Sequence, residues 1–208
     1  MTLSIDNKQQ PNIQCAEERA KECAENSEQT KIDAAFMAKA YTLAQQAEAI
    51  NEIPVGAVVV ANGEIIGQGY NQSITLNDPS AHAEMIAIRQ AGEHLKNYRL
   101  IDCTLYVTLE PCPMCAGLLV HSRINRLVFG APDAKTGAAG SVMNLACHDK
   151  LNHQIDIESG VMAEQCSQLL SDFFKRRRKE IKQQKAALKQ AQLHSTEKEK
   201  EKENKLTK

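Results

Sequence analysis

The feature that most constrains this chain is a set of four side chains shared between two distant segments. His82 and Glu84 stand in the sequence HAE, and Cys112 and Cys115 stand in PCPMC, about 30 residues later. Zinc prefers imidazole and thiolate ligands, and a catalytic zinc site takes three protein ligands and leaves the fourth position to water. If His82, Cys112 and Cys115 bind one ion, the fold must bring these two segments together.

The spacing within each segment suits catalysis by a metal. Cys112 and Cys115 are three residues apart and share one face of a helix, in a first turn where the helix dipole favours thiolate. Glu84 lies two residues beyond His82, where it can stand beside a water that zinc activates. Zinc lowers the pKa of such a water to about 7. A carboxylate within reach can then take its proton and pass it to a substrate nitrogen.

Each half of this pattern has a simpler explanation when taken alone. A single C-x-x-C can be a redox pair or a chance occurrence, and a histidine near a helix start is usually structural. A four-cysteine structural zinc site would need a second C-x-x-C, which the sequence lacks. The two halves together match H-x-E…P-C-x-x-C, the signature of zinc deaminases that act on nucleobases. The odd total of seven cysteines also argues against a closed set of disulfides.

Periodicity predicts a mixed α/β domain in which helices cover a small sheet. Apolar residues at helical spacing predict a first helix from Asp33 to about Ile50, and Asn62-Gly63 predicts a hairpin turn. Asp78-Pro79 predicts the start of a second helix. The remaining expected elements are strands at 55–61, 64–70, 101–108, 126–131 and 154–158, helices at 78–95 and 111–122, and a long helix from 162.

Charge is distributed unevenly along the chain. Residues 1–174 carry 12 basic and 21 acidic side chains, a net of −9, whereas residues 175–208 carry 13 basic and 5 acidic side chains, a net of +8. The overall charge of −1 therefore conceals a basic C-terminal segment, which suggests a nucleic-acid or membrane partner. No apolar run approaches the roughly 20 residues that span a bilayer. We therefore expect a cytoplasmic protein without a membrane partner.

Composition also predicts three regions. Residues 1–31 are polar and acidic and are expected to form a flexible extension, residues 32–180 are expected to form the deaminase domain, and residues 181–208 are expected to pass from helix to a disordered, charged tail. The low-complexity stretch beyond Gln192 is the part of that tail with the strongest bias.

From residue 36 to 180 the chain resembles the bacterial tRNA-specific adenosine deaminase family, within the cytidine-deaminase-like superfamily. HAE and PCxxC resemble the superfamily as a whole, whereas DAKTGAAGS (133–141) and SDFFKRRRKE (171–180) resemble the tRNA branch. The resemblance implies a three-layer α/β fold with a central five-stranded mixed sheet flanked by helices, and a long C-terminal helix.

The resemblance also implies the reaction and its residues. The reaction would be hydrolysis of adenosine to inosine at wobble position 34 of a tRNA anticodon, in an arginine tRNA, with release of ammonia, by a homodimer with one zinc ion per subunit. His82, Cys112 and Cys115 would bind the zinc, Glu84 would shuttle protons, and activated water would attack C6 of the adenine. The implied substrate contacts are Asn71, Ala83, Asp133, His148, Phe174, Arg177 and Arg178.

Several of these residues have ordinary structural interpretations. Asn71 and Asp133 could simply complete turns, and at least one residue of the pair Phe173-Phe174 should lie in the core. The basic run 175–179 could be a solvated helix face, and Cys147-His148 could be a second metal pair. Pro113 departs from the aliphatic residue that the family often has between the two cysteines. Proline lacks the N–H that could bond a thiolate.

Two other functions remain open at this point. A small-molecule deaminase for a cytosine-type or guanine-type base would keep the zinc residues but would not need a basic helix after the domain. A non-catalytic RNA-binding relative would have lost Glu84 or a zinc ligand, and all four residues are present.

Overall fold

The computed structural model describes the backbone of residues 13–206 and the side chains of residues 27–189. Five strands form one mixed sheet in the order β2-β1-β3-β4-β5. β1 is antiparallel to β2 and β3, whereas β3, β4 and β5 run parallel. The bounds are β1 Gly56–Ala61, β2 Glu64–Tyr70, β3 Thr104–Leu109, β4 Arg126–Ala131 and β5 Asp156–Ser159. The predicted α/β class and five-stranded mixed sheet are confirmed.

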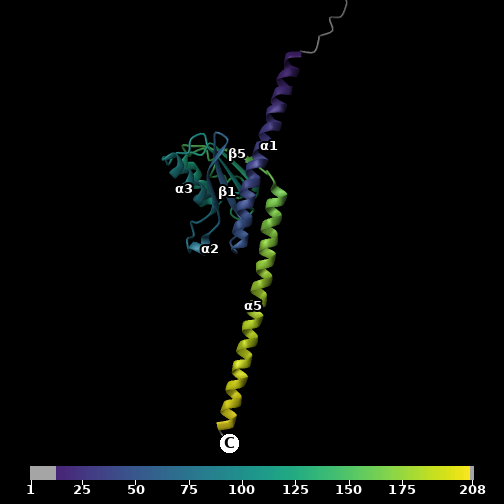
Figure 1. Cartoon of the computed structure of the whole chain (residues 1–208), viewed down its shortest axis with the longest axis vertical. Coiled ribbons are helices and arrows are strands. Elements are labelled where there is room, and N and C mark those ends of the chain that lie inside the picture. The colour runs from purple at the N-terminus through teal and green to yellow at the C-terminus, as the bar shows by residue number, and fades with distance from the viewer. Residues whose placement is uncertain (1–12, 207–208) are drawn as a thin grey trace, which may run out of the picture.

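The described residues form five helices, and the three longest of them pack on the sheet (Figure 1). Their bounds are α1 Ile13–Ala49, α2 Ser73–Leu76, α3 Ala83–Leu95, α4 Pro113–Ser122 and α5 Ala163–Leu206. α1 and α5 run side by side along one side of the sheet, α3 covers the other, and α5 extends well past the rest of the domain. Within the described part of the chain, no helix is both long and apolar enough to cross a bilayer.

The hairpin between β1 and β2 forms where Asn62-Gly63 predicts it. Both residues have positive φ, 52° at Asn62 and 80° at Gly63, which is the conformation of a two-residue hairpin turn. Ala61 and Glu64 are paired across the turn. The turn therefore sets the register of the strand pair on which the first helix packs.

Both long helices exceed the sequence-based expectation. α1 begins at Ile13 instead of near Asp33, and α5 remains helical to Leu206 instead of ending near Gln192. Neither stretch contains Gly or Pro. The first is rich in Ala, Glu, Lys and Gln and the second in Glu and Lys, which are good helix formers. The apolar periodicity that the prediction used marks only the parts that pack on the sheet. Residues 1–12 and 207–208 of the two predicted terminal regions lie outside the described residues.

The start of α3 was also predicted wrongly. The carboxylate of Asp78 accepts hydrogen bonds from the amide and the hydroxyl of Ser80, at 2.8 and 2.7 Å, and so closes a turn instead of capping a helix. The helix begins five residues later, at Ala83, and His82 precedes it in an extended conformation. The later start matters for the site, because it places His82 at the N-terminal end of α3 as its N-cap residue.

A buried ion pair joins α1 to the sheet. Asp33 accepts two hydrogen bonds from the Arg126 guanidinium, at 2.7 and 2.8 Å, and a third from the Tyr106 hydroxyl at 2.9 Å. The Asp33 side chain is only 3% exposed. Burial on its own would raise the pKa of Asp33, but the hydrogen bonds from Arg126, Gln29 and Tyr106 outweigh it and leave the pKa below its ordinary value.

Replacing Asp33 by alanine should destabilise the fold by about 3 kcal/mol, because it leaves Arg126 without its buried partner. The free energy of unfolding, measured by urea denaturation, checks this. The pKa of Asp33 is depressed in the fold, so its contribution is present above the ordinary pKa and is lost as pH falls through the folded value. The difference between the two proteins should therefore shrink in acid below about pH 4.

Glu28→Ala is the matched control. Glu28 pairs with Lys31 on the same helix at 3.3 Å, but both side chains are more than 60% exposed. Exposed pairs of this kind contribute about 0–1 kcal/mol. Equal destabilisation by the two variants would contradict a structural role for the buried pair.

Candidate active site

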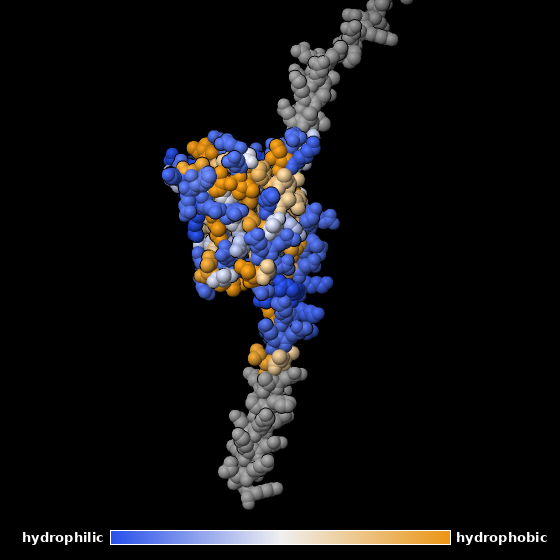
Figure 2. Space-filling model, in the orientation of Figure 1, coloured by the Kyte–Doolittle hydropathy of each residue, from blue (hydrophilic) through white to orange (hydrophobic). Residues whose placement is uncertain are grey.

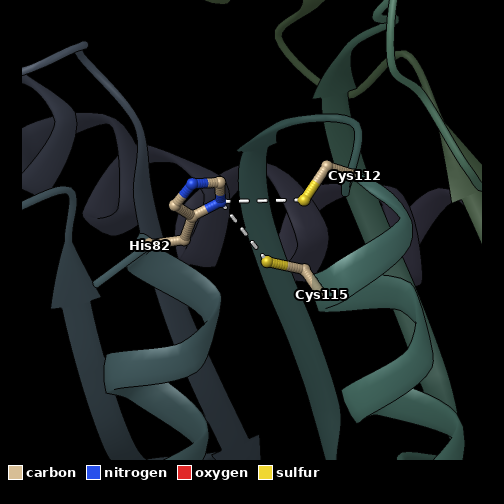
Figure 3. Close-up of side chains that lie close together, drawn as sticks. All are labelled: His82, Cys112 and Cys115. Atoms are coloured by element: carbon tan, nitrogen blue, oxygen red, sulfur yellow. Dashed lines mark hydrogen bonds between the residues drawn. The ribbon is translucent and has the colours of Figure 1, made fainter. Parts of the chain in front are cut away.

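Two helix N-termini converge at the centre of the site (Figure 3). His82 is the N-cap residue of α3, Cys112 is the N-cap residue of α4, and Cys115 lies in the first turn of α4. His82 Nδ1 is 3.7 Å from Cys112 Sγ and 3.6 Å from Cys115 Sγ. The three donor atoms all lie within 4.8 Å of one another. The tertiary structure thus brings together the three residues that the sequence proposed as ligands.

This donor set fits zinc. Tetrahedral zinc with Zn–N of about 2.0–2.1 Å and Zn–S of about 2.3 Å requires a nitrogen-to-sulfur separation of about 3.6 Å. The two observed separations, 3.6 and 3.7 Å, match that requirement without any movement of the side chains. Two thiolates and one imidazole also form a ligand set that zinc prefers and leave a fourth position open.

Pro113 is compatible with this arrangement. It occupies the first turn of α4, directly after the N-cap residue Cys112. Proline is favoured there because its fixed φ suits a helix and the N–H that it lacks would have no partner within the helix. The departure from the family pattern therefore costs the helix nothing.

The three donor groups change one another's pKa, in different directions. A hydrogen bond with Cys115, together with one to His82, lowers the pKa of Cys112 to about 4. Its hydrogen bond to Cys112 raises the pKa of His82. The hydrogen bond to Cys112 and burial raise the pKa of Cys115. Binding of a metal ion requires both thiols to lose their protons, so it should release protons from this cluster.

Glu84 lies beside the cluster in a pocket of about 540 Å³. Its side chain is 4% exposed, and burial is the main reason that its pKa is raised. The other lining residues come from several segments: Ile53, Val55, Asn71, Leu109 and Glu110; Ala131, Pro132, Asp133, Ala134, Lys135 and Thr136; and Ser167, Leu170, Ser171 and Phe174 of α5. The pocket therefore places a buried carboxyl group next to the metal cluster, under a wall supplied by α5.

Asn71 is bonded to the start of α3 and also lines the pocket. Its side-chain oxygen accepts a hydrogen bond of 2.9 Å from the backbone N–H of Ala83, in the first turn of α3. The bond fixes the Asn71 side chain, which is 8% exposed and lines the pocket. The same bond occupies the Ala83 amide, which the resemblance had assigned to the substrate.

The remaining predicted contacts divide into two groups. Asp133 and Phe174 line the pocket, and Phe174 is 41% exposed whereas Phe173 is buried, as the sequence had suggested for one of the pair. His148, Arg177 and Arg178 do not line it. His148 lies on an exposed loop, and its Nδ1 atom accepts a hydrogen bond of 3.2 Å from the backbone N–H of Lys150. No metal group of described residues includes Cys147 or His148.

Sequence reasoning missed Glu110, which organises one wall of the pocket. Its two carboxylate oxygens accept hydrogen bonds from the amides of Asp133, Ala139 and Ser141, at 2.9, 3.0 and 3.0 Å, and from the Ser141 hydroxyl. Gly137 passes so close that a Cβ there would overlap the Glu110 carboxylate. A buried carboxylate requires such donors, but no local pattern in the sequence shows that Glu110 is buried or that it meets this loop.

Exchanging Glu110 for glutamine should loosen this loop and destabilise the protein by about 1.5–3 kcal/mol. The amide NH₂ cannot accept, so one of the two pairs of donors loses its acceptor. Hydrogen exchange at the amides of Asp133, Ala139 and Ser141 should accelerate. The exposed acid Glu158, changed to glutamine, serves as the control and should leave exchange at these amides unaltered; protection preserved in both proteins would remove Glu110 from this role.

Comparison with known proteins places this site in a family. The cytidine and deoxycytidylate deaminase zinc-binding region matches residues 30–131. The tRNA-specific adenosine deaminase of Haemophilus influenzae is 55% identical over 161 residues, which cover 77% of this chain and 93% of the relative. The Bacillus subtilis enzyme of the same name is 48% identical over 150 residues, which cover 72% and 93%.

Solved structures agree with the sequence comparison. A structure from work on A-to-I editing by tRNA:A34 deaminases superposes with a TM-score of 0.64 at 40% identity, over 65% of this chain and 99% of that one. A guanine deaminase from Nitrosomonas europaea, 23% identical with a TM-score of 0.59 over 67% and 83%, shares the fold. The chain therefore belongs to the tRNA-specific adenosine deaminase family and carries its zinc-binding deaminase domain.

Proposed function

We propose that this protein is a zinc-dependent tRNA adenosine deaminase that converts adenosine 34, at the wobble position of an anticodon, to inosine. The observation that carries the proposal is the pocket, which joins the His82/Cys112/Cys115 cluster and Glu84 to the Asp133 loop and Phe174. The 55% identity to a tRNA-specific adenosine deaminase supports this substrate over a free base.

The chemistry is a hydrolysis in which a C–O bond replaces the C6–N bond of adenine, with water consumed and ammonia released. His82, Cys112 and Cys115 would hold the zinc ion, which when bound lowers the pKa of a water molecule towards 7. Glu84 takes the proton of the attacking water and delivers it to N1 of the ring. It then takes the second proton from the hydroxyl group on C6 and transfers it to the amino group, which leaves as ammonia while the C6 carbonyl forms.

The other pocket residues hold the base in place. Asn71, fixed by the Ala83 amide, offers its NH₂ group to the edge of the flipped purine. Asp133 lies on the loop held by Glu110 and approaches the sugar, and exposed Phe174 offers a ring on which a neighbouring base can stack. A base in an anticodon loop is unpaired, so its extrusion costs less than in a duplex.

An RNA stem-loop that carries the anticodon tests the proposal directly. The zinc-loaded protein should form inosine from this RNA, and the same RNA with A34 replaced by G should yield none. Free adenine, guanine, cytosine and their nucleosides are the competing substrates. Turnover of a free base with no inosine in the stem-loop would assign the protein to the small-molecule deaminases instead.

The finer assignments belong to the same proposal. We infer a homodimer that modifies an arginine tRNA in the cytoplasm, with residues 32–180 as the deaminase domain. Exposed apolar side chains on α4 and on the loop beside it, Met114, Val142 and Met143 at 38%, 50% and 46%, support a protein contact near the pocket. The molar mass in solution, measured by light scattering, tests the dimer.

A further inference from the structure

One face of α5 lines the pocket and then continues beyond the domain. With 3.6 residues per turn, positions 4, 8, 11 and 15 residues after Phe174 return to within about 80° of it around the helix axis. These positions are Arg178, Lys182, Lys185 and Lys189, and we call them the cation row. All four side chains are exposed. The lower part of α5 stands clear of the domain and is largely hydrophilic where it is described (Figure 2).

The charge of the cation row is not neutralised by nearby acids. Glu180 is the only acid between residues 175 and 189. Its carboxylate is held by Arg176 and Arg177, at 3.1 and 2.8 Å, on a different side of the helix. Among the side chains that the structure describes, no ion pair includes a member of the cation row.

The direction of the cation row is set by an anchor to the domain. The Arg176 guanidinium donates a hydrogen bond to the Asn51 side chain at 2.9 Å and lies 3.6 Å from the Glu48 carboxylate, at the end of α1. It also lies 5.3 Å from the centre of the buried Phe173 ring. These contacts prevent α5 from turning about its axis, so the cation row continues the pocket wall.

We propose that the cation row binds the phosphodiester backbone of the RNA strand that leaves the active-site pocket. This inference rests on the proposed function. From Phe174 to Lys189 the helix rises about 22 Å, at 1.5 Å per residue, so the row contacts nucleotides well outside the pocket. Four exposed cations on one face suit a polyanion that follows the helix, and such contacts make affinity depend on salt. The sequence-based expectation named Arg177 and Arg178 as RNA contacts. Only Arg178 belongs to the cation row, because Arg177 donates a hydrogen bond to Glu180.

The test compares two variants of the zinc-loaded protein on the anticodon stem-loop. In the neutral variant Lys182, Lys185 and Lys189 become glutamine. In the rotated variant Lys182 exchanges with Gln183 and Lys185 with Ala187, so composition and net charge are unchanged while two cations leave the row. Alanine, glutamine and lysine are all good helix formers, so α5 should persist in both.

The slope of log(kcat/KM) against log(salt) is the main readout. It should become shallower by about 0.7–0.9 for each phosphate that no longer meets a cation, in the rotated variant as well as in the neutral one. KM should rise while kcat stays unchanged, and the effect should be smaller with the anticodon loop alone, which is too short to follow the row.

Four outcomes would overturn the inference. A wild-type slope in the rotated variant would show that only net charge matters. Binding to phosphatidylserine vesicles that the rotated variant loses, with no change in the RNA slope, would assign the row to a membrane. Absence of inosine with the wild-type protein would remove the proposed function and the row with it, whereas normal wild-type editing with unaltered variants would remove the row alone.

Discussion

Replacing Glu84 by alanine should lower kcat on the anticodon stem-loop by about 10²–10⁴-fold while zinc stays bound. Proton transfer by a positioned carboxylate contributes rate factors of this size. Glu84 lies in the first turn of α3, 4% exposed, and lines the same pocket as His82 and Cys112. It is not a member of the His82/Cys112/Cys115 donor group. Removal of its side chain should therefore spare the metal and abolish the proton shuttle.

Two controls separate chemistry from packing. Glu84→Gln keeps the volume of the side chain but cannot carry the proton, so it should be as inactive as the alanine variant. Glu93→Ala removes an exposed carboxylate from the same helix and should leave kcat unchanged. The measurement is the rate of inosine formation, with zinc quantified in each protein. A near-normal rate in Glu84→Gln would exclude Glu84 as the proton shuttle.

Replacing Cys115 by alanine should remove zinc and activity together. Cys115 is fully buried, and its sulfur is 3.6 Å from His82 Nδ1 within the donor group. With one thiolate gone, two ligands remain, which is fewer than a catalytic zinc site requires. Since metal binding stabilises the fold that presents the ligands, the variant should also melt at a lower temperature than the zinc-loaded protein.

A chelator distinguishes loss of metal from loss of packing in this experiment. Chelation should lower the Tm of the wild-type protein but leave that of Cys115→Ala nearly unchanged. Cys166→Ala is the matched control, because Cys166 is also a buried thiol but lies outside the donor group. It should keep its zinc and its response to the chelator. A full complement of zinc in Cys115→Ala would disprove the assignment of Cys115 as a ligand.

Local patterns predicted the elements of the fold well, because strand alternation and turn chemistry act over a few residues. Asn62-Gly63 formed the expected turn, and all five strands lie where the sequence predicts them, within a few residues at their ends. The errors have two causes. At Asp78 a side chain bonded its local turn instead of a helix end, and in α1 and α5 polar helices extend past the apolar faces that periodicity detects.

In the site, too, the sequence predicted what depends on residue type and missed what depends on contacts between distant segments. The residue types of His82, Glu84, Cys112 and Cys115 carried the chemistry, because zinc and proton transfer each demand few side chains. Glu110 could not be found this way, since its role depends on amides of a loop more than 20 residues later. The functions of the basic residues in 175–189 also depended on which of them met Glu180, Glu48 and Asn51.

By itself, then, the sequence determined the ligand chemistry, the sheet and its helices, and the presence of a basic segment after the domain. The tertiary structure decided that Asp33 meets Arg126 from 93 positions away and that Arg176 meets Asn51 from 125 positions away. It also decided which face of α5 continues the pocket wall. Periodicity and residue type are local properties, whereas the direction in which a charged side chain points is set by contacts between segments that only folding brings together.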